Sequence, residues 1–378
     1  MSRFWFLFVL FSFLSCSEKQ AQGIENEGID HKHSIPHSPE NYICYRTESV
    51  IDIDGIMNEK EWQMAAWTKS FVDIEGKLKP NPFLDTRVKM MWDDKYFYFF
   101  AKMEEPHIWA KLTQRDAVIF YDDDFEIFID PDGDSHNYYE FEVNAFNTLW
   151  ELILLRPYRA DRDPKVLDNW NIPDIQSAVH IEGTINDPSD TDQFWSVEMA
   201  IPWTALMELA PLRKNKIPIS GDQWRVNFSR VDWTMKVIDG KYEKEKDSET
   251  GKSLPENNWV WSPTGFINMH MPEQWGYVQF SEKRVGEAAE EFVEDQDLWV
   301  KDGLWNLYFQ QRKYHKQNNT FTNDLKHLSI PELPSNSCKF QPEIYTTPNM
   351  FEIIAESCTK KGQWSIRQDG KIQFFPYN

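Results

Sequence analysis

The stretch Asp123-Asp124-Phe125-Glu126-Ile127-Phe128-Ile129-Asp130 decides the fold of this chain. It is a short run rich in Ile and Phe, and it ends at Pro131-Asp132-Gly133-Asp134, which is typical of a strand followed by a tight turn. The next run, residues 138–145, alternates between two faces. One face carries Tyr139, Phe141, Val143 and Ala145, and the other carries Tyr138, Glu140, Glu142 and Asn144. This period of two predicts a second strand.

The same pattern continues outward in both directions, from about residue 41 to residue 282. Short alternating or aromatic runs are separated by Asp, Asn, Gly and Pro, and the one clear helical stretch covers residues 58–67. Further strands are predicted at 86–92, 96–103, 149–156, 177–183, 194–201, 223–232 and 275–280. About ten strands with so few helical periods predict a mainly β protein, a two-sheet antiparallel β-sandwich.

The composition narrows the class of protein. The 378 residues include 61 acidic and 40 basic side chains, a formal net charge of −21, which argues against nucleic acid as a partner. A hydrophobic fraction of 41% with a mean hydropathy of −0.62 excludes a polytopic membrane protein. The 17 Trp residues are informative, because Trp fills cores, anchors interfaces or stacks on flat apolar ligand faces. Such a chain indicates a β-rich extracytoplasmic module, with sugar as one ligand class.

The N-terminus indicates the compartment. Residues 1–3 are short and basic, residues 4–14 form an apolar run too short to span a bilayer, and Ser15-Cys16 follows. A small residue before a Cys at this point is similar to a bacterial lipoprotein signal, which predicts a signal peptide at 1–15 and lipidation of Cys16. An ordinary signal peptide with an incidental Cys is the alternative. We expect a protein lipid-anchored to the membrane of the cell envelope, at the outer membrane and facing the periplasm or the surface, with residues 16–40 as a flexible tether.

The remaining cysteines fall into two groups. Cys338 and Cys358 both lie in the C-terminal part of the chain, and an oxidising envelope permits a disulfide between them. Cys44 lies in a predicted strand, where a buried free thiol is the expected state.

Several sequence blocks follow one another in order along the predicted sandwich. They are residues 54–62 (DGIMNEKEW), 92–96 (WDDKY), 123–130 (DDFEIFID), 194–203 (FWSVEMAIPW), 224–228 (WRVNF) and 275–280 (WGYVQF). In this order they resemble the family 9 carbohydrate-binding modules over about 240 residues, nearly two thirds of the chain. The resemblance implies a sandwich of two antiparallel sheets and carbohydrate binding. Modules of this family are commonly appended to polysaccharide-degrading enzymes.

The resemblance also implies where a sugar binds. In the best-known modules two Trp rings clamp a terminal sugar; the first position here holds Phe120 and Tyr121, and the second reads Met269-His270-Met271. Glu126 matches a carboxylate that contacts hydroxyls, Asn144 matches a polar strand residue, and Glu142 stands where a basic residue is expected. Sugar binding needs stacking rings and charge-assisted hydrogen bonds. The candidate residues are Phe120, Tyr121, Glu126, Glu142, Asn144, Trp150, Trp170 and His270.

Some of these residues have a second interpretation. Glu126 and Glu140 lie on strands, where such residues are more often solvated, outward-facing side chains than ligands. Four Trp lie outside the strongest blocks, in loops or at strand ends, where they either face a ligand or simply pack. They are Trp150, Trp170, Trp233 and Trp259.

Two Asp-rich runs look like metal ligands. They are residues 122–124 and the group Asp130, Asp132 and Asp134. Calcium takes six to eight oxygen ligands, and the second run has the one-three-five spacing of an EF-hand loop. Its Gly falls at the fourth position and no helices flank it, so a plain Asp-rich turn is the alternative. A structural calcium is the cofactor that these Asp-rich runs suggest.

Residues 283–378 are predicted to form a separate unit, a helix plus a small β structure. The helix is expected to begin within 282–297 and to continue past residue 304 at helical spacing. Three or four short strands are expected between residues 340 and 375, with residues 368–371 as a hairpin turn.

The sequence contains no serine nucleophile elbow, Walker loop, HExxH or CxxC motif. We therefore expect non-catalytic binding of an oligo- or polysaccharide that assists polysaccharide breakdown or uptake. Hydrolysis of O-glycosyl compounds is suggested only by the family's association with glycoside hydrolases. One alternative is a haem-binding electron-transfer module that uses Met103, Met269, His270 or Met271. The other is a structural envelope subunit without sugar binding.

Overall fold

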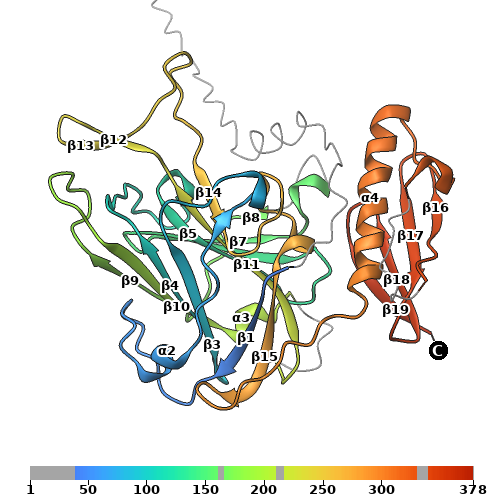
Figure 1. Cartoon of the computed structure of the whole chain (residues 1–378), viewed down its shortest axis with the longest axis horizontal. Helices are drawn as coiled ribbons and strands as arrows, with labels where there is room; N and C mark the ends of the chain where they lie inside the picture. Colours follow the sequence, from blue (N-terminus) through green and yellow to red (C-terminus); the bar gives the residue numbers. More distant parts are fainter. Residues whose placement is uncertain (1–38, 161–165, 210–216, 330–338, 378) are drawn as a thin grey trace, which may run out of the picture.

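The computed structural model describes residues 39–160, 166–209, 217–329 and 339–377. Figure 1 shows a large β-sandwich beside a smaller unit in which a helix packs against a sheet. Within the described residues, 13 strands of the sandwich hydrogen-bond into one continuous sheet, in the order β8-β7-β6-β5-β11-β15-β1-β3-β4-β10-β9 with β14 and β2 off this path. The strands are β1 (Asn41–Arg46), β2 (Val72–Asp73), β3 (Thr86–Trp92), β4 (Tyr96–Glu104), β5 (Asp124–Asp130), β6 (Tyr138–Asn144), β7 (Leu149–Leu154), β8 (Val166–Leu167), β9 (Gln176–Glu182), β10 (Phe194–Pro202), β11 (Gln223–Asp232), β14 (Asn257–Val260) and β15 (Gly276–Arg284).

The sheet folds over on itself, and its two halves enclose a single core. Phe125 and Phe141 from one half share this core with Phe99 and Val197 from the other. The predicted β-sandwich is therefore confirmed. It departs from two purely antiparallel sheets at β1, which pairs in parallel with both β15 and β3 and so links the halves.

Tryptophan side chains fill much of the sandwich. Trp92, Trp195, Trp203 and Trp224 are buried in the core. Trp62 is buried under a second small cluster, where its Nε1 donates a hydrogen bond to Glu198 at 2.7 Å. Most of the described Trp residues thus stabilise the fold, because each large ring removes much apolar area from water.

Helices are few and short in the sandwich. The helix expected at 58–67 is reduced to α2 (Lys60–Met64), because Ala65 already has the extended backbone angles φ −61° and ψ 138°. The other helical segments here are η1 (Gly76–Leu78), η2 (Ile119–Tyr121), η3 (Tyr158–Ala160), α3 (Trp203–Leu206) and η4 (Pro272–Gln274). A hairpin of β12 (Met235–Ile238) and β13 (Lys241–Lys244) projects from the sandwich in Figure 1.

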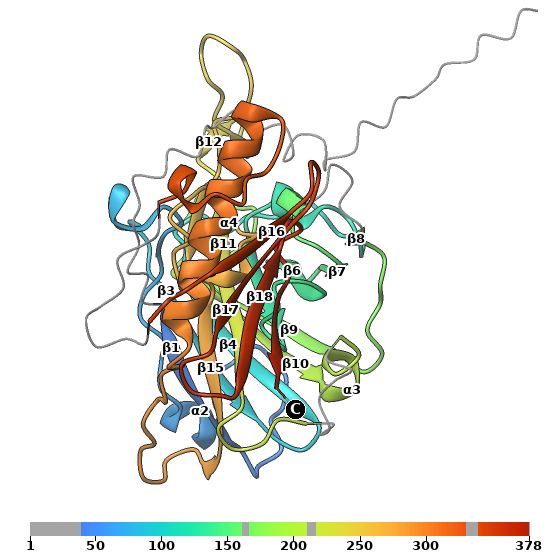
Figure 2. The same cartoon turned by 90° about the vertical axis from the view of Figure 1, so that its right-hand side faces the viewer.

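The C-terminal unit has its own core. Helix α4 (Leu298–Asn318) packs on β17 (Phe351–Glu356) and β18 (Gly362–Arg367), as Figure 2 shows. β16 (Glu343–Thr346), β19 (Ile372–Pro376) and the short η5 (Leu325–His327) complete the unit. Gly303 allows Phe340 to approach the helix closely, since a Cβ at this position would lie 2.6 Å from the Phe340 ring. The expected helix and small sheet are present.

The segment before α4 differs from the prediction. No helix begins within 282–297: β15 extends to Arg284, and α4 begins at Leu298. The intervening chain instead follows β15, because Val293 N–H donates to Gln279 Oε1 at 2.9 Å and Gln279 Nε2 donates to the Glu291 carbonyl at 3.1 Å. Side-chain hydrogen bonds from a strand have replaced the helix ladder here.

The two units touch through the β5–β6 turn. Lys371 pairs with Asp134 at 2.8 Å, and the Ile372 N–H donates to the Asp134 carbonyl at 3.1 Å. The Arg159 guanidinium lies 5.1 Å from the Trp305 ring of α4. Within the part of the chain that the structure describes, no helix has both the length and the apolar character to span a membrane.

Candidate functional site

A row of carboxylates lies on the outer face of β5 and β6. These side chains alternate with core residues along both strands, so they point away from the sandwich core. In the antiparallel ladder Glu126 lies directly opposite Glu142. Asp124 is the neighbouring same-face residue on β5, and Glu140 is the neighbouring same-face residue on β6.

Three of these carboxylates form a compact group, which we call the outer triad: Asp124, Glu126 and Glu142. One carboxylate oxygen of each lies within 4.8 Å of the others. Asp124 is completely buried and Glu126 keeps only 6% of its surface exposed. Glu140 is buried beside them. The interpretation of Glu126 and Glu140 as solvated side chains is therefore wrong.

Burial and mutual repulsion act on these acids in the same direction. Burial, and then repulsion from Glu126, raises the pKa of Asp124 well above its usual range. Burial, and then repulsion from Asp124, does the same to the pKa of Glu142. Burial raises the pKa of Glu126 to about 7, and the facing Ser229 hydroxyl opposes this rise. None of the main contributions to these shifts comes from a basic side chain.

Aromatic rings and a lysine border the outer triad, and we call them the rim: Phe120, Tyr121, Trp233 and Lys244. The Phe120 N–H donates to Glu142 Oε2 at 3.0 Å, and Trp233 Nε1 donates to the Phe120 carbonyl at 2.9 Å. Lys244 Nζ lies 3.1 Å from the centroid of the Trp233 ring, and burial lowers its pKa to about 8. Tyr121 is 47% exposed. The rim thus places an exposed ring and a cation beside buried carboxylates.

A second group of carboxylates lies on the inner face, at the end of β5 and β11. We call it the inner triad: Glu105, Asp123 and Asp232. Its oxygens also lie within 4.8 Å of one another. Buried Arg230 is paired with Glu105 at 2.7 Å and with Asp232 at 3.1 Å. The inner triad therefore contains its own cation.

The structure brings together five of the predicted sugar-site residues. Phe120 and Tyr121 lie in the rim, Glu126 and Glu142 lie in the outer triad, and Trp150 is the register partner of Glu142 on β7. Trp150 is half-buried, and its Nε1 donates to the Asp168 carbonyl at 2.8 Å.

Asn144 lies on the same face but has no capacity for a ligand. Its Nδ2 donates to the Leu112 carbonyl at 2.8 Å and to Asp122 at 2.9 Å. Its Oδ1 accepts from the N–H groups of Phe146 and Thr148, both at 3.1 Å. All four hydrogen-bonding positions of this amide therefore pin neighbouring loops, and we assign Asn144 a structural role.

Trp170 and His270 lie apart from the outer triad. Trp170 stacks on Tyr139 in the sandwich core, with ring centroids 5.4 Å apart. His270 is buried at the other end of the outer face, where its Nδ1 contacts the Tyr138 hydroxyl at 2.9 Å. Burial, and then the charge of Arg159, lowers the pKa of His270 to about 3. Trp259 is also buried in the core.

The suggested haem ligands do not form one set. Met103 is completely buried in the core between the sheet halves, whereas Met269 and His270 pack on the outer face around Phe128. A haem iron cannot take ligands from both faces of one sheet half at once.

The β5–β6 turn uses its carboxylates internally. Asp130 accepts hydrogen bonds from the N–H groups of Gly133 and Ser135, both at 2.9 Å, and Asp134 pairs with Lys371. These contacts are those of an Asp-rich turn, and calcium bound by Asp130, Asp132 and Asp134 stays a prediction.

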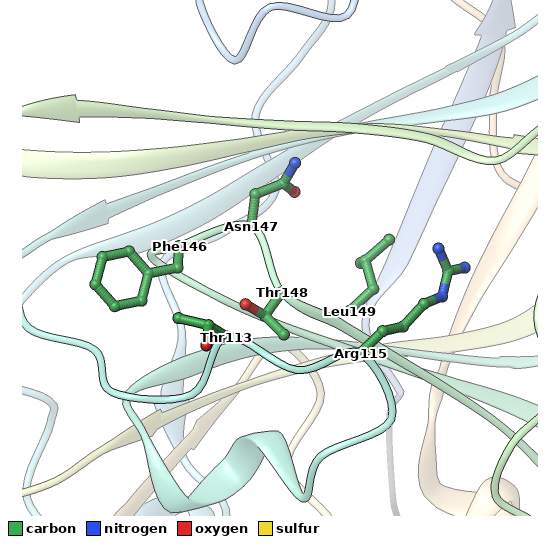
Figure 3. Close-up of a pocket in the computed structure, with 6 residues that line it drawn as sticks. All are labelled: Thr113, Arg115, Phe146, Asn147, Thr148 and Leu149. Carbon is green, nitrogen blue, oxygen red and sulfur yellow. The ribbon is translucent and has the colours of Figure 1, made fainter.

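An open hollow of about 370 Å³ lies at the β6–β7 turn. Figure 3 shows its lining, in which the Phe146 ring of the turn and the Arg115 side chain of a neighbouring segment point to opposite sides. Phe146 is 40% exposed. Arg115 forms an ion pair with buried Glu151, and its Nε donates to that carboxylate at 3.2 Å. The hollow is a second place with an exposed ring beside a cation.

The described residues include two of the four cysteines, Cys44 and Cys358. Cys44 is a buried free thiol, as expected. Cys358 is disulfide-bonded, while Cys338, its predicted partner, lies outside the described residues. Cys16 and the tether also lie outside them.

Sequence reasoning named Asp124 in a metal-like run and Trp233 as a possible ligand-facing ring, but it did not join them to Glu126, and it missed Lys244. The alternation of Asp124, Glu126 and Phe128 on β5 could have placed Asp124 beside Glu126. Lys244 gave no signal, because it arrives from a projecting hairpin more than a hundred residues further along the chain.

Comparison with known proteins bears on the sandwich alone. Residues 53–219 match the family described as carbohydrate family 9 binding domain-like. Over these residues the sandwich is similar to the carbohydrate family 9 binding domains.

Curated relatives match over 118 and 129 residues of this chain. Exoglucanase XynX of Acetivibrio thermocellus is 28% identical over 118 residues, 31% of this chain and 9% of that protein. Endo-1,4-beta-xylanase C of Paenibacillus barcinonensis is 29% identical over 129 residues, 33% of this chain and 10% of that protein. The match thus spans about a tenth of the length of these relatives.

Solved structures also resemble the chain. A family 9 carbohydrate-binding module from Caldicellulosiruptor kristjanssonii in complex with glucose covers 66% of this chain and is itself covered completely, at 16% identity and a TM-score of 0.39.

Proposed function

We propose that this protein binds an oligo- or polysaccharide without cleaving it, and that the rim and the outer triad form the binding site. The observation that supports this most is the match of residues 53–219 to a family of carbohydrate-binding domains. We further propose that the chain acts in the cell envelope, anchored through lipid at Cys16, where it assists polysaccharide breakdown or uptake.

The chemistry of the rim suits a sugar. A sugar presents an apolar C–H face that stacks on an aromatic ring, and hydroxyls that bind to charged groups. Tyr121 offers the exposed ring, and Lys244 can donate to hydroxyl oxygens. Glu126, the most exposed member of the outer triad, can accept from them.

A binding role fits the carboxylates better than hydrolysis does. A glycosidase holds two carboxylates on either side of the scissile bond, with room for the sugar between them. Glu126 and Glu142 are cross-strand neighbours, buried and in mutual contact range, so a glycosidic bond cannot enter between them.

Affinity electrophoresis of the full chain against soluble plant and algal polysaccharides tests the proposal. At least one polysaccharide should retard the wild-type protein. Tyr121→Ala should weaken this binding by roughly fivefold, the value expected for one stacking ring. Phe146→Ala is the matched control, because it removes a similarly exposed ring from the hollow in Figure 3.

Two results would contradict the assignment. If Phe146→Ala weakens binding and Tyr121→Ala does not, the hollow at the β6–β7 turn is the sugar site. If no polysaccharide retards the protein, the structural envelope role gains weight.

A further inference from the structure

The outer triad poses an electrostatic problem that the described residues do not solve. Three carboxylates with oxygens within 4.8 Å of one another are buried on the outer face of β5 and β6. Like charges at such distances repel strongly where water is excluded. Such a group is stable only if its members are protonated or if a cation neutralises them.

Carboxylate oxygens of this acidic face are buried without hydrogen-bond partners among the described residues. Within the described part of the chain, neither carboxylate oxygen of Asp124 has a hydrogen-bond partner, although the side chain is completely buried. The Val231 N–H lies close enough to Asp124 to oppose the rise of its pKa. Glu140 Oε2 next to it is also buried without a partner. Buried polar atoms are satisfied in almost all proteins, so unpartnered carboxylate oxygens aimed at other carboxylates indicate a ligand.

The geometry suits a hard divalent cation. Calcium binds carboxylate oxygens at about 2.4 Å, so two oxygens on opposite sides of the ion lie about 4.8 Å apart. The outer triad has its three oxygens within this limit. Three carboxylates supply up to six oxygens, and Ser229, which faces Glu126 across β5 and β11, offers a hydroxyl oxygen as well. Calcium prefers such all-oxygen sites, whereas softer metals prefer nitrogen and sulfur.

We propose that Asp124, Glu126 and Glu142 bind a divalent cation, with calcium preferred. The site is distinct from the Asp-rich β5–β6 turn, whose carboxylates already hold backbone N–H groups and Lys371. It is also distinct from the inner triad, where Arg230 occupies the position of the cation. The ion binds beneath the rim, but its binding does not depend on any sugar.

Isothermal titration of the EDTA-treated, dialysed full chain with calcium chloride tests this proposal with the metal alone. We expect saturable binding of one ion with a dissociation constant in the micromolar range. Terbium offers a second readout, because a lanthanide bound in the outer triad lies near the indoles of Trp150 and Trp233 and gains sensitised luminescence. Calcium should displace the terbium.

Substitutions locate the ion. Asp124→Asn and Glu142→Gln keep the side-chain shape and remove one charge each, and each should weaken calcium binding by at least about tenfold. Asp132→Asn in the β5–β6 turn is the control and should leave the affinity unchanged. Far-UV circular dichroism in EDTA checks that the variants fold, and Glu126→Gln replaces any variant that does not.

Each other outcome overturns the proposal. Loss of binding in Asp132→Asn with full binding in Glu142→Gln places the ion in the turn. Absence of calcium and terbium binding in the folded wild-type chain means that protonation alone stabilises the outer triad. Because these titrations contain no sugar, a failure here leaves the proposed sugar binding standing, and the reverse holds too.

Discussion

The inner and outer triads face the same electrostatic problem and have different solutions. Each groups three buried carboxylates with oxygens within 4.8 Å. Their members Asp123 and Asp124 are neighbours in the sequence, yet they belong to different triads because successive side chains of a strand point to opposite faces. The inner triad encloses Arg230, whereas none of the main influences on the outer triad comes from a basic side chain.

This difference separates a structural site from a ligand site. A buried carboxylate group that has its own arginine is complete in the chain itself. A similar group without one is complete only with protons or with an ion from solution. A buried acidic cluster therefore indicates a ligand site only when the chain supplies no basic side chain to neutralise it.

Removing Arg230 should have the largest effect on stability, because it takes away the cation of the inner triad. Arg230→Met keeps much of the apolar stem but leaves the inner triad without its cation. Breaking a buried ion pair in this way costs about 3 to 5 kcal/mol, so we expect a loss of that size in the free energy of unfolding. Urea denaturation at neutral pH measures it.

Arg87→Met is the matched control for this experiment. Arg87 pairs with Asp85 at 2.7 Å, but its side chain is 45% exposed, so its loss should cost less than about 1 kcal/mol. Equal and small effects of both substitutions would show that Arg230 does not stabilise the inner triad. Repeating the denaturation in calcium shows whether the emptied inner triad now behaves like the outer one.

Buried His270, at the opposite end of the outer face, makes the stability of the protein depend on pH. His270 has its pKa lowered to about 3 by burial and then by Arg159. Below about pH 6.5 the unfolded chain takes up a proton that the folded chain does not, so the stabilising contribution is present above pH 6.5 and is lost as the pH falls towards 3. The rings of Tyr138, Tyr158 and Phe128 pack around His270, and the nearby Arg159 is itself paired with Glu273.

The measurement compares wild type with His270→Gln. Between pH 7 and pH 5 the wild type should lose about 2 kcal/mol more in the free energy of unfolding than the variant. Urea denaturation at several pH values gives both curves. Parallel curves would mean that His270 becomes protonated in the folded protein, and that this end of the face is wetter than the structure indicates.

Much of this arrangement follows from sequence pattern, and some of it cannot. Alternation along 138–145 places Glu140 and Glu142 on one face, as the structure confirms. Their burial could not be predicted, because it depends on the rim, whose residues Phe120, Trp233 and Lys244 come from distant segments. The prediction of a helix start within 282–297 was wrong. This stretch has acidic residues and Ala, which are typical of a helix start, but hydrogen bonds to the β15 side chain Gln279 hold it extended.

The resemblance to family 9 modules predicted the fold better than it predicted the site. Its blocks are short strands with buried Trp and Phe, and local pattern is sufficient to identify such elements. Asn144, by contrast, matches a polar position of the family but has its amide fully occupied by neighbouring loops. Only the three-dimensional contacts reveal that such a residue has no free capacity.

Two isosteric substitutions, one in each triad, should change the free energy of unfolding in opposite directions. Asp124→Asn removes repulsion from the outer triad, and in EDTA it should raise the free energy of unfolding by about 1 kcal/mol, the size of a like-charge cross-strand contact. Asp232→Asn removes a partner of Arg230 and should lower it by about 1 kcal/mol or more.

Calcium should change only one member of this pair. At saturating calcium the wild type should gain stability over Asp124→Asn, because an ion that binds the folded state stabilises it by mass action. Asp232→Asn should keep its deficit in both conditions. The same sign for both substitutions in EDTA would mean that the two triads do not differ in the way their charges suggest.

The smallest expected effect concerns Lys244, the basic side chain of the rim. Its main partners among the acids are Asp123, Asp122 and Glu256 rather than the outer triad. Lys244→Met should therefore leave calcium affinity within about twofold of wild type. It should weaken sugar binding by about 0.5 kcal/mol, roughly twofold, through loss of one half-buried charge and its contact with Trp233.

Calcium titration and affinity electrophoresis on the same preparation decide the point. A rise of about tenfold in calcium affinity would show that Lys244 serves the outer triad as its cation. The outer triad would then resemble the inner one, with a lysine in place of Arg230, and the distinction between them would fail. Unchanged calcium affinity with weaker sugar binding would instead separate the rim, which contacts the sugar, from the acids beneath it, which hold the ion.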